Sequence, residues 1–457
     1  AGLDDLRSTC ARVAAGIDHV LLMGMGGSSL FPEVLARATA PDGPAPASGA
    51  PRLHVLDTTD PAAVARLAGE LPPERTLHVA ASKSGSTLET RSHLAWAWDR
   101  HPDPARFAVI TDPGSALAEL ARERGFAAVW ENRPDIGGRY SALSLFGVVP
   151  GLLAGADVAA MLATASDMSE RLRASSSANP AARLAAVMAA GVRTGRDKLT
   201  IVVPDQVAAF GLWLEQLIAE STGKDGTGVV PVVGEPLAAP DRYGDDRVFV
   251  SLGLHPGLDA LAAAGHPVCV LPFDGDVPAL GGQVLLWELA TALAGALLGI
   301  QPFDQPDVAA AKAATARVLE EGRPDLPTVP LADLLDRLEA GDHLAIQAFV
   351  DPGDPVVERI EAARVALRDR FRVATTVGLG PRFLHSTGQL HKGGPPNGVF
   401  VQVLQEHEVD VPIPEEPYGF RELEAAQADG DLVTLHERER RAGRVAIDEL
   451  VAQGARR

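Results

Sequence analysis

The chain has 457 residues, a formal net charge of −19, 46% hydrophobic residues and 22% charged residues. These values are typical of a globular protein, and the length predicts two or three domains rather than one core. The acidic balance excludes a general nucleic-acid binder, which needs a basic face. It permits an anionic small molecule held by local backbone N–H groups.

Two cysteines, Cys10 and Cys269, exclude a disulfide scaffold and indicate a reducing compartment. The longest apolar run, residues 289–300, is too short to cross a bilayer. The chain does not open on a basic segment followed by an apolar one, the pattern of a signal peptide. We therefore expect a cytoplasmic protein with no membrane partner.

Strand-like apolar runs alternate with amphipathic stretches in the first third of the chain. The predicted strands are residues 19–23, 53–56, 77–81 and 107–110, and each is followed by a helical pattern. This alternation is typical of an open parallel sheet. It predicts a first α/β domain over residues 1–175.

A second series with the same rhythm begins near residue 198. Its predicted strands are residues 199–204, 229–233, 247–252 and 268–271, with a helix over 206–220. We predict a second doubly wound parallel-sheet domain over residues 176–321. One large sheet with a helical insertion is the alternative.

The last part of the chain has a different pattern. A Pro/Asp-rich stretch at residues 322–329 reads as a linker, and strands are expected at 343–350, 373–378 and 398–403. We predict a smaller C-terminal α+β unit over residues 322–457. Its tail, residues 421–455, is expected to be a charged helix with a mostly solvated face.

Two loops lie between a predicted strand and a predicted helix. The first, Gly-Met-Gly-Gly-Ser-Ser at residues 24–29, offers backbone N–H groups and a helix N-terminus to an anion. It lacks the third glycine of the dinucleotide fingerprint and the lysine of a P-loop, so a tight turn explains it equally well. The second is Ser-Lys-Ser-Gly-Ser-Thr at residues 82–87.

The second loop carries more hydroxyl groups than a helix start requires. Ser86 and Glu89 fit a capping box, which is the structural explanation for those two residues. A capping box does not need Ser82, Ser84 or Thr87. Hydroxyl groups beside a helix N-terminus suit a phosphate monoester, so the loop predicts phosphate binding.

Three further segments place charged residues beside glycine turns or helix ends. Arg139 lies in Asp-Ile-Gly-Gly-Arg-Tyr-Ser, Glu220 ends an apolar helix before Gly223, and Lys312 follows the segment Phe-Asp-Gln-Pro-Asp-Val. A carboxylate that leaves an apolar helix can be desolvated enough to act as a base. A surface arginine, a helix-terminal glutamate and a capped surface helix are the structural alternatives.

The ordered set GMGGSSL, SKSGSTLET, DIGGRYS, ESTGK and FDQPDVAAAK resembles phosphoglucose isomerase, which is built from two sugar-isomerase (SIS) domains. The C-terminal segment FLHSTGQLHKGGPPNGVF, residues 383–400, is similar to the isomerase half of bifunctional transaldolase/phosphoglucose isomerase proteins. The resemblance implies a homodimer and a transaldolase domain that is fused elsewhere or missing.

The resemblance also implies roles for individual residues. Glu220 would move a proton between C1 and C2 of a sugar phosphate, and Arg139 would stabilise the cis-enediolate. Lys312 would assist ring opening together with a histidine. The phosphate would be held by Gly27, Ser28, Ser82, Ser84 and Thr87.

The histidine for ring opening departs from the family pattern. The family's histidine motif is absent between Glu220 and the Phe-Asp-Gln segment. The segment Ser386–His391 resembles it, and His385 lies just upstream. We favour His391, because the Thr-Gly-Gln element and a glycine pair flank it directly. His385 and His255 are the alternatives.

We expect an isomerase that interconverts glucose 6-phosphate and fructose 6-phosphate without a cofactor. The chain shows no group of histidines and carboxylates at ligand spacing, so no metal is expected. Mannose 6-phosphate or an amino sugar phosphate are alternative substrates. A sugar-phosphate sensor without turnover is the alternative from another class, although Glu220 and Lys312 favour an enzyme.

Overall fold

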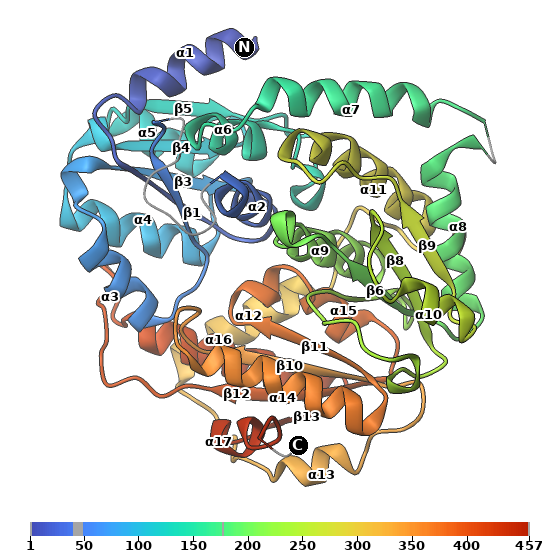
Figure 1. Ribbon diagram of the computed structural model, residues 1–457. Coiled ribbons are helices and arrows are strands. Elements are labelled where there is room, and N and C mark those ends of the chain that lie inside the picture. Colours follow the sequence, from blue (N-terminus) through green and yellow to red (C-terminus); the bar gives the residue numbers. More distant parts are fainter. Residues whose placement is uncertain (1, 40–48, 176–177, 456–457) are drawn as a thin grey trace.

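The structure is a computed structural model that describes residues 2–39, 49–175 and 178–455. It contains three separate sheets, and every strand pair in them is parallel. Figure 1 shows one sheet at the upper left, one at the right and one at the bottom, with the chain ends at opposite poles.

The first sheet has the strand order β2-β1-β3-β4-β5. Val20 of β1 lies opposite Leu53 of β2 and Leu77 of β3, so β1 and β3 are central neighbours. The chain order reverses between these two strands, which is where open α/β sheets bind ligands. The strands are β1 (His19–Gly24), β2 (Arg52–Leu56), β3 (Thr76–Ser82), β4 (Phe107–Thr111) and β5 (Ala128–Glu131).

Helices cover both faces of the first sheet (Figure 1). Successive strand residues point to opposite faces. Leu22 and Val79 therefore join one core with Phe31 of α2, while Leu21 and Ala80 join another with Leu94 of α4. The helices are α1 (Leu3–Val13), α2 (Leu30–Thr39), α3 (Pro61–Glu70), α4 (Leu88–Arg100), α5 (Ala116–Glu123) and α6 (Leu145–Leu153).

The second sheet has the order β7-β6-β8-β9 and shares the larger core with the first. Its strands are β6 (Lys198–Val202), β7 (Val230–Val232), β8 (Arg247–Leu252) and β9 (Val268–Leu271). The helices around it are α7 (Val158–Leu172), α8 (Pro180–Arg193), α9 (Phe210–Thr222), α10 (Leu258–Ala263) and α11 (Val277–Leu298).

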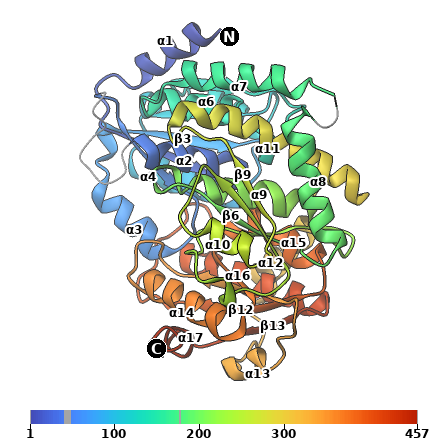
Figure 2. The ribbon, with the colours of Figure 1, turned by 45° about the vertical axis from the view of Figure 1, so that its right-hand side comes forward.

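Helix α11 is the one helix of the described chain that is long and apolar enough to cross a membrane. It packs against α7, α8 and α9, and most of its apolar stretch is buried there (Figure 2). Core helices of globular proteins commonly pass the same test of length and composition.

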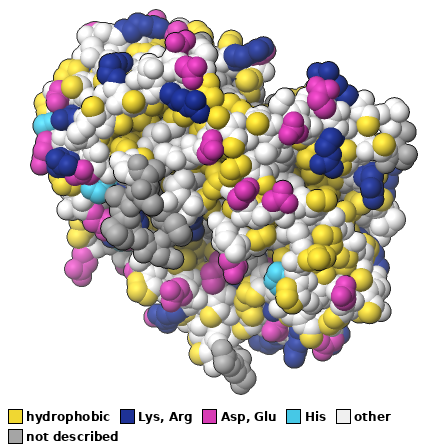
Figure 3. Space-filling model, turned by 45° about the horizontal axis from the view of Figure 1, so that its top comes forward, with side chains coloured by type: hydrophobic (Ala, Val, Ile, Leu, Met, Phe, Trp, Pro, Cys, Tyr) yellow, Lys and Arg dark blue, Asp and Glu magenta, His cyan; other side chains and the backbone are white. Residues whose placement is uncertain are grey.

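The face that comes forward in Figure 3 mixes hydrophobic side chains with charged ones of both signs.

The third sheet has the order β11-β10-β12-β13. Strands and helices alternate in this unit, which the sequence predicted as a smaller α+β unit, and its sheet is entirely parallel. Its strands are β10 (His343–Phe349), β11 (Ala374–Leu379), β12 (Gly398–Leu404) and β13 (Arg441–Arg444). Its helices are α12 (Val308–Glu321), α13 (Leu331–Leu335), α14 (Val356–Phe371), α15 (Gly388–Gly393), α16 (Phe420–Glu437) and α17 (Ile447–Val451).

Helix α16 is largely buried, whereas the sequence predicted a charged helix over residues 421–455 with a mostly solvated face; the same stretch also holds β13 and α17. Several polar side chains of α16 face inward, and two of its carboxylates are paired there. Asp431 binds Lys392, and Asp429 lies 2.8 Å from the guanidinium of Arg444. Paired charges can be buried where lone charges cannot, so the acidic composition of α16 misled the prediction.

Candidate active site

The two predicted anion loops lie side by side at the reversal point of the first sheet. Gly24 ends β1 directly opposite Ala81 of β3, so the loops that follow these strands are neighbours. The first loop forms a short 3₁₀ helix, η1 (Gly26–Ser28). The second leads into α4, with Thr87 at the N-cap position.

Gly26 and Gly27 bring the first loop against three other segments. Gly26 has φ +55°, and a Cβ there would lie 2.8 Å from both the amide nitrogen of Gln216 and the carbonyl oxygen of His385. A Cβ on Gly27 would lie 2.0 Å from the carbonyl oxygen of Gly138. Only glycine permits these approaches. The loop therefore meets α9, the η8 turn (Arg382–His385) and the η4 turn (Gly138–Tyr140).

The serine loop presents a connected set of hydroxyl groups. The Ser82 and Thr87 hydroxyls lie 3.0 Å apart, and those of Ser84 and Ser86 lie 2.9 Å apart. The N–H of Gly85 donates to the Ser82 hydroxyl. These groups stand at the N-terminus of α4, where an anion is stabilised by the helix dipole.

The ammonium group of Lys83 is already paired and does not face a ligand of this loop as a free charge. This group is paired with Asp112 and donates to the carbonyl of Pro134. The loop therefore offers hydroxyl and N–H donors, with its one lysine already engaged. Ser28 of the neighbouring loop is buried.

Glu220 and Arg139 form a buried ion pair. A carboxylate oxygen of Glu220 lies 2.9 Å from Nη1 of Arg139, and the side chains are 11% and 3% exposed. The amide of Gln216, one turn earlier on α9, donates to the other oxygen at 3.1 Å. The same amide donates to the carbonyl of His385 at 2.8 Å. The carboxylate is thus fixed from two sides.

The segment around Phe303 holds Arg139 mainly through its backbone. Nη2 of Arg139 donates to the carbonyls of Pro302 and Asp304, at 3.2 and 2.7 Å. Nη1 donates to the side chain of Gln305 at 3.1 Å. This segment therefore positions the guanidinium, a role that its sequence did not reveal.

His385 and Glu89 form a second pair beside the serine loop. Nε2 of His385 lies 2.8 Å from Oε1 of Glu89, which also accepts from the amide of Gln427 at 2.7 Å. Burial opposes ionisation of Glu89, but the charge and hydrogen bond of His385 and the nearby Lys312 lower its pKa to about 2. Glu89 is therefore an ionised partner for the imidazole.

A cavity of about 560 Å³ opens onto this second pair. Ser86 and Glu89 line it from the first domain, Lys312 from α12 and His385 from η8. The Lys312 side chain is exposed there. Lys312, His385 and Ser86 of the serine loop thus line one cavity, while Ser82, Ser84 and Thr87 do not line it. Gln216 connects His385 to Glu220 through its two hydrogen bonds.

His391 is not among the residues that line this cavity. It is 5% exposed, its Nδ1 faces the amide of Gln347 at 3.1 Å, and its ring packs between Phe383 and Phe400. Burial and the adjacent Lys392 hold its pKa well below the usual range. The segment after His385 folds into α15, which turns His391 into the core of the third unit.

Sequence reasoning missed Gln216, Gln305, Glu89 and Gln427, which hold the predicted residues in place. The spacing of Gln216 and Glu220, four residues apart on one helix, was a usable signal for the first of them. Glu89 was explained as a capping residue. The contact of Gln427 with Glu89 joins α16 to α4, which no local pattern could indicate.

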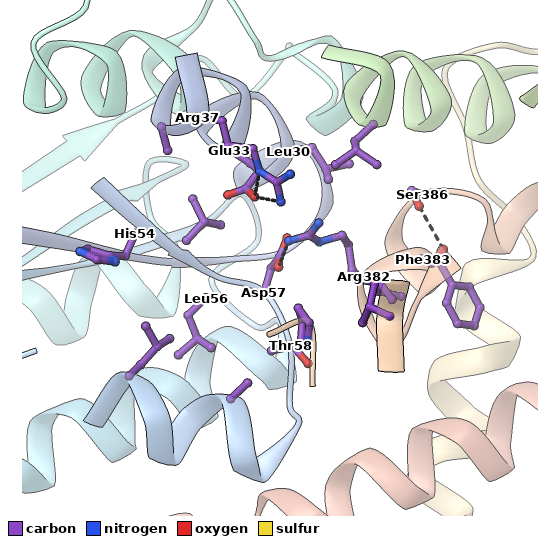
Figure 4. Close-up of a pocket in the computed structure, with 18 of the residues that line it drawn as sticks. Leu30, Glu33, Arg37, His54, Leu56, Asp57, Thr58, Arg382, Phe383 and Ser386 are labelled. Carbon is purple, nitrogen blue, oxygen red and sulfur yellow. Dashed lines mark hydrogen bonds and ion pairs between the residues drawn. The ribbon is translucent and has the colours of Figure 1, made fainter. Parts of the chain in front are cut away.

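A larger cavity, of about 650 Å³, lies between the first domain and the third unit. Figure 4 shows the pairs Asp57–Arg382 and Glu33–Arg37 on its wall. None of the site residues predicted from the sequence lines it. Volume alone therefore does not mark the candidate active site.

Parallel α/β domains with anion loops at the strand-order reversal and a buried carboxylate–arginine pair define a phosphosugar isomerase of the SIS type. The chain aligns with a glucose-6-phosphate isomerase from Chlamydia trachomatis over 70% of this chain and 73% of that one, with a TM-score of 0.57 and 20% identity. A hypothetical protein from Thermus thermophilus aligns over 69% of this chain and 87% of that one, with a TM-score of 0.62 and 27% identity.

Sequence comparison narrows this class to one family. Residues 4–234 match the profile described as phosphoglucose isomerase. The glucose-6-phosphate isomerase of Rubrobacter xylanophilus is 32% identical over 365 residues, which span 68% of this chain and 84% of that relative. The chain belongs to the phosphoglucose isomerase family.

Proposed function

We propose that this protein interconverts glucose 6-phosphate and fructose 6-phosphate. The proposal is in line with its relatives, which are named glucose-6-phosphate isomerase. The observation that carries the proposal is the buried pair of Glu220 and Arg139, 2.9 Å apart. The pair lies on loops and helices that also meet the anion loops. An acid–base group next to a fixed cation is what proton transfer through an enediolate requires.

Glu220 is the general base of the proposed reaction. Its carboxylate removes the proton from C2 of the open-chain aldose, the C–H electron pair becomes the C1–C2 double bond of the cis-enediolate, and the π electron pair of the C1 carbonyl moves onto O1. Return of the proton to C1, together with transfer of the O2 hydroxyl proton to O1, gives the ketose. The amide of Gln216 fixes the orientation of the carboxylate throughout, because it binds the second oxygen.

Arg139 stabilises the negative charge that develops on the enediolate oxygens. Its guanidinium is held by two carbonyls and Gln305, so it need not reorganise during the reaction. Preorganised charge of this kind is the largest single contribution to many enzymatic rate enhancements. The cation is therefore assigned to the transition state rather than to phosphate binding.

The phosphate of the substrate is assigned to the two loops after β1 and β3. Hydroxyl groups and N–H groups there suit a dianion at the N-terminus of α4. Binding energy from this remote group fixes the reacting carbons next to Glu220. The residues assigned to it are Gly27, Ser28, Ser82, Ser84 and Thr87.

His385 is assigned to ring opening, in place of His391. Its imidazole contacts the ionised Glu89 and lines the cavity that Lys312 shares. A histidine held by a carboxylate is a common arrangement for moving a proton, here between O1 and O5 of the cyclic sugar. Lys312 supplies positive charge on the same wall.

A coupled assay of fructose 6-phosphate conversion tests the function directly. We expect turnover to glucose 6-phosphate, together with exchange of the C2 hydrogen of glucose 6-phosphate in deuterated water. Faster turnover of mannose 6-phosphate or an amino sugar phosphate would reassign the substrate. Tight sugar-phosphate binding with no exchange on any of them would contradict the enzyme and favour a sensor.

The proposal includes a homodimer in the cytoplasm that needs no cofactor. Free thiols at Cys10 and Cys269 suit a reducing compartment. Light scattering coupled to gel filtration measures the oligomeric state. A monomer with full activity would contradict the dimer.

A further inference from the structure

Three side chains with metal-binding atoms meet where the first domain touches the third unit. They are Asp60 just before α3, His407 in the segment after β12, and Glu424 in the second turn of α16. One ligand atom from each lies within 4.8 Å of the other two. The three residues are far apart in the sequence, so no ligand spacing could have indicated them.

The donor atoms are buried and lack hydrogen-bond partners among the described residues. The side chains of Asp60, His407 and Glu424 are 0%, 7% and 1% exposed. Oδ2 of Asp60, Nε2 of His407 and Oε1 of Glu424 make no hydrogen bond. Nε2 of His407 lies 2.7 Å from Oδ2 of Asp60, but the contact does not have hydrogen-bond geometry.

Of the two carboxylate oxygens of Asp60, one has a hydrogen-bond partner and the other has none. Its Oδ1 accepts the N–H of Ala63 at 2.9 Å and so caps α3, while its Oδ2 turns toward His407 and Glu424. The carboxylate thus divides its two oxygens between a helix cap and the three-residue cluster. A capping role alone does not account for the second oxygen.

The charges in the cluster favour a divalent cation. Asp60 and Glu424 are both buried, and Asp351 is a third buried carboxylate near them. Asp351 is already paired with Arg66 at 2.8 Å. Two buried carboxylates that face one another are costly unless positive charge lies between them. A dication offsets both.

We propose that Asp60, His407 and Glu424 bind one zinc ion, or a divalent transition metal of similar preference, that joins the first domain to the third unit. An imidazole nitrogen with two carboxylate oxygens suits Zn²⁺, whereas Mg²⁺ and Ca²⁺ take oxygen ligands. Tetrahedral ligands about 2.0 Å from zinc lie roughly 3.3 Å from each other. The Nε2 of His407 lies 2.7 and 3.7 Å from the two carboxylates, so small side-chain movements suffice.

The ion would hold α16 in place against the first domain. Glu424 lies one turn before Gln427, which accepts from the Thr59 hydroxyl at 2.6 Å and donates to Glu89. The site is thus a structural one, at a distance from Glu220. The proposed metal site lies at the interface between the first domain and the third unit, and it does not depend on the proposed reaction.

Metal content and thermal unfolding of the full chain test the proposal. The protein is treated with a chelator, desalted and given one equivalent of zinc sulfate, and bound zinc is measured by mass spectrometry after a second desalting. We expect about one zinc per chain and a higher Tm than that of the metal-free protein. Less than about a tenth of an equivalent bound, with an unchanged Tm, overturns it.

Variants locate the ion. His407→Gln and Glu424→Gln should each weaken zinc binding at least about 100-fold, because even residues that only support a ligand contribute 10- to 100-fold. The matched control is His101→Gln, which alters a histidine 3.9 Å from Asp103 at the surface and should bind zinc normally. Undiminished binding by both site variants overturns the assignment to these residues.

A measurement on the unaltered chain tests the metal site even if the variants fail to fold. Cobalt(II) added to the metal-free protein should give the visible absorption of a four- or five-coordinate nitrogen–oxygen site, and zinc should abolish it. An absorption spectrum identical to that of hydrated cobalt contradicts the proposal. In that case a direct His407–Asp60 ion pair accounts for the cluster.

Discussion

Helix α9 carries two buried carboxylates, Glu215 and Glu220, that differ in what surrounds them. Glu220 lies 2.9 Å from the guanidinium of Arg139 and accepts from Gln216. Glu215 faces the larger cavity, where burial raises its pKa to about 8 although Arg364 opposes the shift. The two side chains are similarly buried but have different partners, and the partners decide which carboxylate can serve a reaction that creates negative charge.

The largest expected effect is a loss of turnover when Glu220, but not Glu215, is replaced. Glu220→Gln keeps the shape of the side chain and removes the proton acceptor, so we expect turnover to fall by at least about 10²-fold. Exchange of the C2 hydrogen of glucose 6-phosphate in deuterated water should fall in parallel. Both are measured at saturating substrate.

Glu215→Gln is the matched control, five residues earlier on the same helix. It should keep turnover within about 3-fold, because Glu215 lines a different cavity from the proposed site. Near-normal exchange by Glu220→Gln, or a large loss by Glu215→Gln, would reverse the assignment of the base.

A second comparison separates His385 from His391. We expect His385→Gln to slow turnover of cyclic glucose 6-phosphate by about 10- to 10²-fold, because the imidazole beside Glu89 is assigned to ring opening. The variant should leave proton exchange on an open-chain 5-deoxy analogue nearly intact. Comparison of the two substrates is the measurement.

His391→Gln serves as the control because it keeps a polar side chain toward Gln347. Its effect, if it folds with a lower Tm, should be equal on both substrates. A loss confined to the cyclic substrate in His391→Gln, and absent from His385→Gln, would return ring opening to His391.

The serine loop should affect binding more than turnover. Replacement of Ser84 and Thr87 by alanine removes hydroxyl donors to the phosphate, each worth roughly 1.5–3 kcal/mol when charge-assisted. We expect KM for fructose 6-phosphate to rise about 10²-fold or more in the double variant, with a smaller change in kcat. An unchanged KM in the double variant would remove the loop from the site.

The last prediction concerns stability rather than rate. Because the pKa of Glu215 is raised from 4.5 to about 8, its contribution is fully present below pH 4.5 and is lost as the pH rises through 8. Glu215→Gln removes this loss, on the order of 3 kcal/mol between pH 5 and pH 8. The Tm difference between variant and unaltered chain should therefore shift in favour of the variant across that range. Parallel Tm curves would contradict the raised pKa.

Much of the fold follows from local patterns. Apolar runs before glycine loops predicted β1 and β3, and alternation predicted parallel sheets. Strand β5 and the burial of α16 were missed, because β5 is short and the inward charges of α16 depend on partners far along the chain. Periodicity reports burial only when the buried residues are apolar.

For the candidate site too, the sequence predicted the positions of loops but not the directions of individual side chains. The loops after β1 and β3 were predicted as strand-to-helix turns, and they lie beside each other in the structure. The choice between His385 and His391 could not be made from flanking residues, because it depends on whether the segment ends in a turn or continues into α15. Side-chain direction is a property of the folded segment rather than of the motif.

The backbone carbonyls that hold Arg139 have a consequence for how this chain can vary. Every residue type supplies a carbonyl, so the hold on the guanidinium depends on the backbone path of residues 302–304, while the Asp304 carboxylate has a separate task in binding Lys224. Phe303, between the two anchoring positions, is 62% exposed. Insertion or deletion of one residue would instead move both oxygens at once. The position of the guanidinium is therefore sensitive to the length of this segment.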